Sequence, residues 1–162
     1  MARIFISIGS NINPSENVRC AVSVLRQYFS DIQVSPVYES EAVGFAGDNF
    51  LNLVVGASTD LEIHEVNTLL HTIEDEYGRD RSGPRFSSRT IDLDLLLYDD
   101  MVIKEDGLEI PREEITRNAF VLWPLADIAP NVVHPEKQQT IAELWAAFDK
   151  QSQALWPVDI DL

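Results

Sequence analysis

The stretch Thr-Ile-Asp-Leu-Asp-Leu-Leu-Leu-Tyr at residues 90–98 is nearly all apolar apart from two aspartates. A run of this length and character predicts a central, buried strand of a sheet. Because alternate residues of a strand point to the same face, the carboxylates of Asp92 and Asp94 should project together, about 6.5 Å apart along the chain. Burying them on an apolar strand is unfavourable unless a cation or hydrogen-bond donors compensate the charge. The rest of the chain should therefore supply both a sheet and a cationic partner.

The segments before this strand alternate between the hydrophobic period of a strand and that of a helix. Their patterns predict five elements, namely strands at 3–8, 32–39 and 50–55 and helices at 14–29 and between 60 and 77. The resulting order, β-α-β-β-α-β, is typical of ferredoxin-like folds. A short strand at 108–111 and helices at 118–128 and 140–148 should follow. We therefore predict an α+β fold with a ferredoxin-like βαββαβ core and extra C-terminal helices.

End signals predict where the first two helices begin and end. Asn13 is expected to be the N-cap of the first helix, with Pro14 at its first position. Thr59 or Asp60 is expected to cap the second helix, and Gly78 to end it as the glycine after a helix commonly does. The residues after Gly78 should then form a loop that leads into the apolar strand.

The composition limits the classes of protein to which the chain can belong. Its 162 residues fit a single domain, residues 1–162, and 27 acidic against 12 basic residues give a net charge of −15. Duplex nucleic acid and anionic membranes require a basic face, so neither is expected as a partner. Cys20 is the only cysteine, and no apolar run approaches the length of a membrane span. We expect a cytoplasmic monomer that binds small molecules.

That loop contains four of the nine arginines within a segment of eleven residues, at Arg79, Arg81, Arg85 and Arg89. A guanidinium pairs with two phosphate oxygens at once and stays charged near neutral pH. Ion pairs with nearby acids explain one or two such arginines more easily than four. The loop therefore predicts a site for a phosphorylated ligand, with a solvated or ion-paired loop as the alternative.

The aspartate pair beside this loop predicts a metal site. Carboxylate oxygens suit Mg²⁺, which usually takes one or two of them and completes its coordination with water and substrate phosphates. The alternative is that arginines alone neutralise Asp92 and Asp94. Next to four arginines, the pair favours metal-assisted phosphoryl chemistry. The chain has neither a G-x-x-x-x-G-K-[ST] loop nor a kinase glycine loop, so those two nucleotide-binding classes are excluded.

Five stretches occur in the order found in one known family. They are Ile-Gly-Ser-Asn at 8–11, Ser-Pro-Val-Tyr-Glu-Ser at 35–40, Phe-Leu-Asn at 50–52, Gly-Arg-Asp-Arg at 78–81 running on to Arg-Thr-Ile-Asp-Leu-Asp at 89–94, and Asn-Ala-Phe-Val-Leu-Trp-Pro-Leu at 118–125. With these residues the chain resembles the 6-hydroxymethyl-7,8-dihydropterin pyrophosphokinases of folate biosynthesis. The resemblance implies a ferredoxin-like fold and transfer of diphosphate from MgATP to the hydroxymethyl group of the pterin, with AMP leaving.

The resemblance also implies roles for individual residues. The catalytic residues would be Arg79, Arg89, Asp92 and Asp94. The two aspartates would bind two Mg²⁺ ions that bridge the phosphates of ATP, which is the co-substrate. The residues expected to bind ATP are His71, Glu74, Arg81, Arg89, Arg112 and Arg117. The residues expected to bind the pterin are Ser40, Ala42, Val43, Asn52, Phe86 and Phe120. Among these, Phe120 and Phe86 would stack on the ring, Asn52 would hydrogen-bond to it, and backbone groups of the other three would meet its polar edge.

Two positions depart from the pattern of that family. Arg112 follows Pro111 where the family usually has histidine. Asn118 stands where an arginine usually precedes Ala119, and Arg117 lies one residue earlier. Both arginines still offer donors to phosphate. The departures leave two alternatives open, a same-fold enzyme that acts on a different reduced pterin and a non-catalytic domain that binds a pterin or a nucleotide.

Overall fold

A six-stranded antiparallel sheet organises residues 1–41, 48–78 and 91–162, which are the residues described in this computed structural model. The strand order is β5-β1-β4-β3-β8, and β2 also pairs with β4. The strands are β1 (Ala2–Ser10), β2 (Ser30–Val34), β3 (Val37–Ser40), β4 (Phe50–Thr59), β5 (Asp92–Tyr98) and β8 (Leu155–Val158). A mixed α/β fold built on an antiparallel sheet was predicted from the sequence, and this part of the prediction is confirmed.

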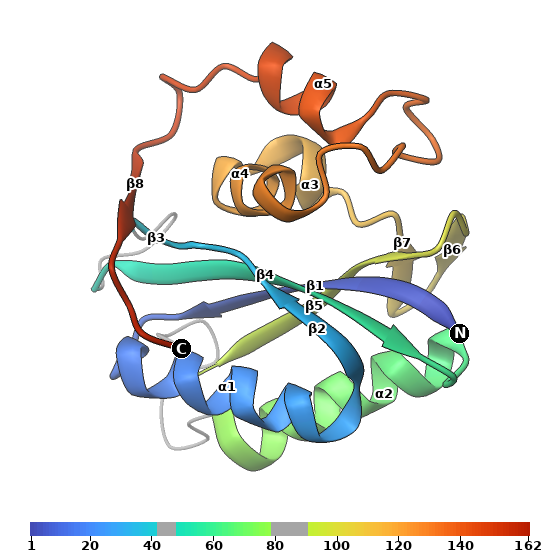
Figure 1. The fold of residues 1–162 in the computed structure, drawn as a ribbon, viewed down its shortest axis with the longest axis horizontal. Coiled ribbons are helices and arrows are strands. Elements are labelled where there is room, and N and C mark those ends of the chain that lie inside the picture. The colour runs from blue at the N-terminus through green and yellow to red at the C-terminus, as the bar shows by residue number, and fades with distance from the viewer. Residues whose placement is uncertain (42–47, 79–90) are drawn as a thin grey trace.

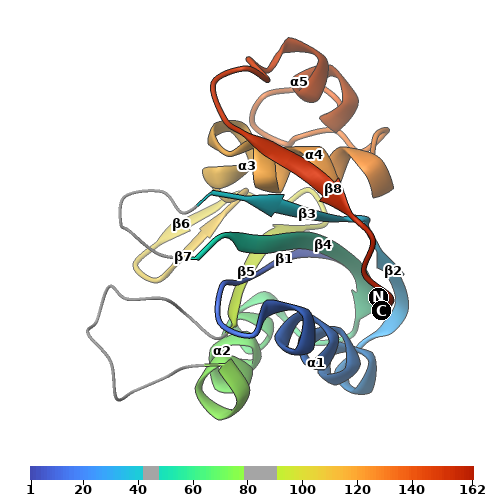
Figure 2. The same ribbon diagram turned by 90° about the vertical axis from the view of Figure 1, so that its left-hand side faces the viewer.

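Helices cover both faces of the sheet (Figure 1 and Figure 2). On one face lie α1 (Pro14–Tyr28) and α2 (Ile63–Ile73). On the other lie α3 (Glu114–Arg117) and α4 (Ala119–Ile128), with α5 (Ile141–Ala147) packed outside α4. A two-stranded hairpin, β6 (Ile103–Glu105) and β7 (Leu108–Ile110), connects β5 to α3. None of the helices in the described residues is long and apolar enough to cross a membrane.

Alternate residues of β1 belong to two different cores. The side chains buried with those of α1 and α2 are Ile4, Ile6 and Ile8. Phe5 belongs instead to the core beneath α4. Each fully buried aliphatic or aromatic side chain stabilises the fold by roughly 1.5–3 kcal/mol, so the two cores together fix which way the strand faces. The same alternation turns Ser7 and Gly9 toward the α4 side, where they are free to line a site.

The strand predicted to be central, β5, lies at one end of the strand order, so its predicted place was wrong. Its burial was predicted correctly, because helices cover both of its faces: α2 packs on one, and Leu96 and Leu97 join the α4-side core on the other. At its outer edge the backbone N–H of Arg112 donates to the carbonyl of Leu96 at 3.0 Å. An apolar strand is therefore compatible with the end of a sheet when both faces are covered.

The single strand predicted at 32–39 is divided into β2 and β3. The break falls at Ser35 and Pro36, and proline has no N–H to continue the ladder. Ser35 keeps the two parts attached to β4, because its N–H donates to the carbonyl of Val54 and its hydroxyl accepts from the N–H of Val54, both at 2.9 Å. The chain can therefore bend here while β2 and β3 remain in the same sheet.

The helix boundaries were predicted better than the caps. Helix α1 begins at Pro14 as predicted, but Asn13 adopts a left-handed conformation (φ 41°) and makes no side-chain cap. Helix α2 is capped by Glu62, whose side chain forms a capping box with Glu65, so the prediction of Thr59 or Asp60 was wrong. Glutamate is rare at an N-cap, which is why the shorter polar residues upstream were preferred.

The end of the second helix also differs from the prediction. After α2 the chain continues as a π-helical turn, Glu74–Gly78, and Gly78 is the last residue of that turn. A glycine after the end of a regular α-helix was expected instead. The wider turn matters for the site because it starts at Glu74, whose side chain reaches β5. π-Turns often occur at functional positions.

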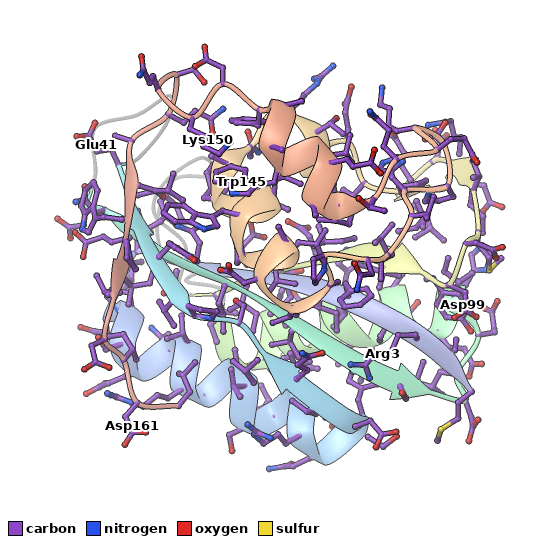
Figure 3. All side chains as sticks on the ribbon, turned by 45° about the horizontal axis from the view of Figure 1, so that its top comes forward. Arg3, Glu41, Asp99, Trp145, Lys150 and Asp161 are labelled. Atoms are coloured by element: carbon purple, nitrogen blue, oxygen red, sulfur yellow. The ribbon has the colours of Figure 1, made fainter. Side chains whose placement is uncertain are left out.

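The C-terminal third combines predicted and unpredicted elements. The expected strand and helices are present as β7, α4 and α5, and Thr140 and Glu143 form a capping box at the start of α5. The strands β6 and β8 and the short helix α3 were not predicted. The chain ends across α1, where Nε of Arg19 donates to the carbonyl of Asp161 at 2.8 Å, and Figure 3 shows Asp161 below β8.

A buried histidine predicts an acid-sensitive contribution to stability. His134 is 3% exposed, and its Nδ1 accepts the backbone N–H groups of Glu136 and Lys137 at 3.2 and 3.1 Å. Burial lowers the pKa of His134, although the charge of Glu136 opposes this. The unfolded chain therefore binds the proton more readily, so the stabilisation is complete above the unfolded pKa of about 6.5 and is lost as the pH falls through the folded value. His134→Asn keeps an acceptor but does not titrate, so its free energy of unfolding should fall less than that of the wild type between pH 7 and pH 5.

Urea unfolding at several pH values measures this difference, and His64→Asn provides a control of opposite sign. The exposed His64 ring contacts Glu62 and Glu105 at 3.2 and 2.9 Å, and hydrogen bonds to these carboxylates raise the pKa of His64. Its contribution is present below the unfolded pKa and is lost as the pH rises through the folded value. If the free energy of unfolding fell equally with pH in the wild type and in His134→Asn, the buried ring would not be the cause of the acid sensitivity.

Candidate active site

The candidate site is a row of residues that crosses three strands. Asp92 on β5 lies opposite Gly9 on β1, and Gly9 lies opposite Asn52 on β4. Residues that are directly opposite in antiparallel strands point to the same face, here the face that carries α4. Gly9 has no side chain, so the space between Asp92 and Asn52 stays open. An ideal Cβ built on Gly9 would lie 3.6 Å from Oδ1 of Asn52.

A cavity of about 330 Å³ lies over this row. The predicted site residues that line it are Ser40, Asn52, Asp92, Asp94, Arg112 and Phe120. Both kinds of predicted chemistry, the carboxylates and the pterin-recognition residues, therefore border one space. Figure 3 shows Glu41, another lining residue, at one end of the sheet and Asp99 with Arg3 at the other, so the cavity occupies one end of the molecule.

A third acid, Glu74, lies beside Asp92 and Asp94 without lining the cavity. Asp92 and Asp94 are half-buried and project from the same face of β5, as predicted. Glu74 reaches them from the π-turn after α2, and one of its carboxyl oxygens accepts the N–H of Leu93 at 3.0 Å. Burial raises the pKa of Glu74 to about 8, supported by a hydrogen bond to Asp92 and by the charges of both aspartates, against the opposing effect of the Leu93 N–H. Burial beside the two aspartates therefore favours the protonated form of Glu74.

Arg112 brings a positive charge to the carboxylate end of the cavity. Its Nη2 lies 3.4 Å from Oδ1 of Asp94, and its Nε contacts the carboxylate of Glu114 in a second ion pair. The side chain is positioned by the segment that follows the cis Ile110–Pro111 peptide, where the N–H of Arg112 is bonded to β5. The alternative interpretation of the aspartates was that arginines neutralise them. The ion pair with Arg112 agrees with that alternative for Asp94.

The opposite end of the cavity is suited to a flat polar ring. Nδ2 of Asn52 donates to Oγ of Ser40 at 2.8 Å and to the carbonyl of Tyr38 at 3.3 Å. These two bonds use both amide hydrogens and fix the orientation of the amide plane, which leaves Oδ1 as the acceptor for a further donor. Phe50 and Phe120 add aromatic surface to the lining. An aromatic face with a few fixed polar groups is what a planar heterocycle requires.

A stack of aromatic rings joins β3, α4 and α5. Trp123, one helical turn after Phe120 on α4, contacts Tyr38 with ring centroids 4.3 Å apart and Trp145 of α5 with centroids 5.4 Å apart. The Tyr38 hydroxyl also donates to Asp127 of α4. Lys150 covers Trp145 at 4.6 Å, and both are labelled in Figure 3. These contacts fix α4 against β3 and so fix the width of the cavity.

The donors around the aspartates fit Mg²⁺. Two half-buried carboxylates face the same cavity, and their charges add to the effect of burial in raising the pKa of Glu74. Among residues 1–41, 48–78 and 91–162, no group of three or more His, Cys, Asp or Glu is arranged to hold a metal ion. Mg²⁺ commonly needs only one or two carboxylates when substrate phosphates complete its coordination. The arrangement therefore suits a metal that binds together with a nucleotide better than a permanently held structural metal.

Other predicted site residues lie away from this cavity or outside the described residues. His71 is exposed on α2, and Arg117 is 68% exposed on α3, where it pairs with Glu113. Neither of them lines the cavity, and their roles in ATP binding stay predictions. The predictions that fall outside the described residues concern Ala42, Val43, Arg79, Arg81, Phe86 and Arg89.

Eight lining residues were not predicted as site residues: Ser7, Ile8, Gly9, Glu41, Phe50, Glu114, Asn118 and Val121. Ser7 and Phe50 could have been found from the strand period, because they lie two residues from Gly9 and Asn52. Asn118 was noted only as a departure from the family pattern. The place of Glu114 depends on the path of the chain after Pro111, for which the sequence offers no local signal.

Paired carboxylates with an arginine beside them suit enzymes that transfer phosphoryl groups with a divalent metal. Residues 5–130 match the family model of the 7,8-dihydro-6-hydroxymethylpterin-pyrophosphokinases (HPPK). The chain belongs to this family. The matched residues include all five of the sequence stretches that carry the resemblance.

Individual relatives agree with the family match. The 2-amino-4-hydroxy-6-hydroxymethyldihydropteridine pyrophosphokinase of Aquifex aeolicus is 34% identical over 145 residues, which cover 88% of this chain and 90% of the relative. That of Bacillus subtilis is 36% identical over 156 residues, covering 94% and 89%. In the crystal structure of Plasmodium falciparum HPPK-DHPS with SDX-DHP, the matched part has a TM-score of 0.69 at 16% identity and spans 90% of this chain but 43% of that longer chain. The structural likeness supports the fold, and the closer sequence relatives support the family.

Proposed function

We propose that the chain transfers the diphosphoryl group of ATP to the hydroxymethyl group of 6-hydroxymethyl-7,8-dihydropterin, giving the pterin diphosphate and AMP, as its named relatives do. The observation that carries the proposal is the shared cavity, with Asp92 and Asp94 at one end and Asn52 at the other. A nucleotide phosphate at the first end and a pterin at the second would meet above Gly9. The presence of folic acid synthesis proteins among the relatives supports the same place in metabolism.

The reaction joins the hydroxymethyl oxygen to the β-phosphorus of ATP. The bond from that phosphorus to the oxygen that bridges it to the α-phosphorus breaks, AMP leaves, and the hydroxyl proton is released. Asp92 and Asp94 would hold Mg²⁺, proposed as two ions, whose charge when bound offsets that of the phosphates. Arg112 lies where its guanidinium can donate to phosphate oxygens. Asn52 would orient the pterin and Phe120 would stack on it, so that the alcohol is held near the phosphate.

The remaining roles are proposed from the family resemblance. Contacts with ATP are assigned to Arg79, Arg81, Arg89, His71, Glu74 and Arg117, and further pterin contacts to Ser40, Ala42, Val43 and Phe86. For Glu74 the position beside Asp92 supports a place near the phosphates and their metal. We also propose a single ferredoxin-like domain over residues 1–162 that works as a cytoplasmic monomer. The strand order β5-β1-β4-β3 with helices α1 and α2 on one face supports the ferredoxin-like part of this proposal.

AMP release tests the proposed function. The protein is incubated with MgATP and, in separate reactions, with 6-hydroxymethyl-7,8-dihydropterin and with reduced pterins that carry other side chains. We expect AMP and the pterin diphosphate in equal amounts with the hydroxymethyl compound. A preference for another pterin would favour the variant enzyme suggested by Arg112 and Asn118. No AMP with any of them would contradict both forms of the proposal.

A further inference from the structure

Arg112 occupies a position that restricts access to one of the proposed metal ligands. Its guanidinium is 3.4 Å from the carboxylate of Asp94, inside the lining of the cavity. The backbone of Arg112 is bonded to Leu96 on the same strand as Asp94, two residues away, and Glu114 contacts Nε from the other side. The charged group is therefore tethered beside Asp94.

The ion pair contributes little to folding. Arg112 and Asp94 are 36% and 28% exposed, and ion pairs with this much solvent contact typically add little stability. The consequence of the contact is therefore local. A guanidinium placed on a carboxylate neutralises that carboxylate and repels a second cation that approaches the same oxygens. Because Arg112 is part of the chain, it competes at a concentration that does not change with dilution.

We propose that Arg112 acts as a built-in counter-cation, which occupies Asp94 in the nucleotide-free protein and must leave it before a divalent metal binds there with full affinity. The proposal rests on the proposed function, since it assigns Asp94 to the metal. Arg112 would then couple the binding of metal and nucleotide, in addition to donating hydrogen bonds to phosphate. The phosphates of a nucleotide give the guanidinium an alternative anionic partner within the same cavity.

The exchange links the two ligands by mass action. A nucleotide that attracts Arg112 away from Asp94 raises the affinity for the metal, and the metal must raise the affinity for the nucleotide by the same factor. Glu114 should limit the movement, because its carboxylate contacts Nε of the guanidinium that must move from Asp94 to a phosphate. Metal binding to the empty enzyme is thus disfavoured, and the two ligands bind together.

The electron paramagnetic resonance signal of free Mn²⁺ measures this competition without catalysis. Mn²⁺ is titrated into the wild type, Arg112→Gln and Arg112→Met, first without nucleotide and then with a non-hydrolysable ATP analogue. Without nucleotide we expect both variants to bind Mn²⁺ about tenfold more tightly than the wild type. The factor by which the analogue raises Mn²⁺ affinity should be about tenfold smaller in the variants. Arg19→Gln, which removes one exposed charge from α1, should match the wild type in both titrations.

Mn²⁺ affinity that is unchanged or weaker in folded Arg112 variants would overturn the proposal. So would tighter binding that Arg19→Gln reproduces, because the effect would then come from net charge. If neither variant folds, the Nε–Hε resonance of Arg112 in the wild type decides: it should shift when the analogue and Mg²⁺ are added, and a constant resonance would contradict the exchange. The AMP assay is independent, so the proposed function can fail while these titrations still give an answer.

Discussion

Asp94→Asn is expected to lower kcat for AMP formation on the order of 10³-fold while the affinity for the pterin changes by less than about threefold. The substitution keeps the shape of the side chain and removes the charge that faces the cavity. The proposed pterin-recognition residues Ser40 and Asn52 lie on β3 and β4, across β1 from Asp94, so they should keep their contacts. Steady-state kinetics with MgATP and isothermal titration with the pterin measure the two quantities.

Asp100→Asn is the matched control for this experiment. Asp100 is exposed in the turn that follows β5, so its replacement by asparagine removes the same charge without altering the cavity. We expect its kcat and its Tm to equal those of the wild type. The assignment would be wrong if Asp94→Asn kept more than a tenth of the wild-type kcat. It would also be wrong if the variant lost pterin binding and folding together, since Asp94 would then be structural.

The same experiment separates an enzyme from a non-catalytic binding domain. A domain that only binds pterin or nucleotide would show no turnover in the wild type, so Asp94→Asn would change metal and nucleotide affinity alone. The geometry favours the enzyme, because the aspartates face the space beside Asn52 instead of a closed pocket of their own. Two carboxylates that only stabilised the fold would not need to point toward the pterin end.

The fold could be predicted where one local signal decided each element. The patterns of residues 3–8 and 140–148 and Pro14 at the start of α1 all led to the observed elements. Strand β8 could not be recognised in the same way. It is four residues long and contains Pro157, which is tolerated because β8 lies at the end of the strand order. Its existence depends on the partner β3, and that partner is remote in sequence.

The site could be predicted in part from strand geometry and in part only from the family resemblance. The common direction of Asp92 and Asp94 follows from their spacing, whereas the role expected of Asn52 does not follow from any local pattern. The contact between Arg112 and Asp94 could not have been derived either. It requires the hairpin β6–β7 to return the chain to the outer edge of β5, and that path is set by tertiary packing.

Asn52→Ala is expected to lower kcat/KM for the pterin on the order of 100-fold and to leave KM for ATP within about twofold. Asn52 is 5% exposed and fixed by two hydrogen bonds, so a pterin donor that meets Oδ1 would lose a bond that water cannot replace in the same geometry. The control is Asn67→Ala on α2, which removes an asparagine amide bonded to the Gly107 carbonyl outside the cavity. Equal effects of the two substitutions on the pterin would contradict the role of Asn52.

Ser40 should act on the pterin through Asn52, and a double-mutant cycle can show this. Its hydroxyl accepts from Nδ2 of Asn52 at 2.8 Å, so Ser40→Ala should free the amide to rotate and lower kcat/KM for the pterin about tenfold. In the Asn52→Ala background the same change should have almost no further effect, because the amide that it orients is gone. Ser40→Thr, which keeps the hydroxyl, should restore most of the activity. Two losses that multiply to about 1,000-fold would mean instead that the Ser40 hydroxyl contacts the pterin independently of Asn52.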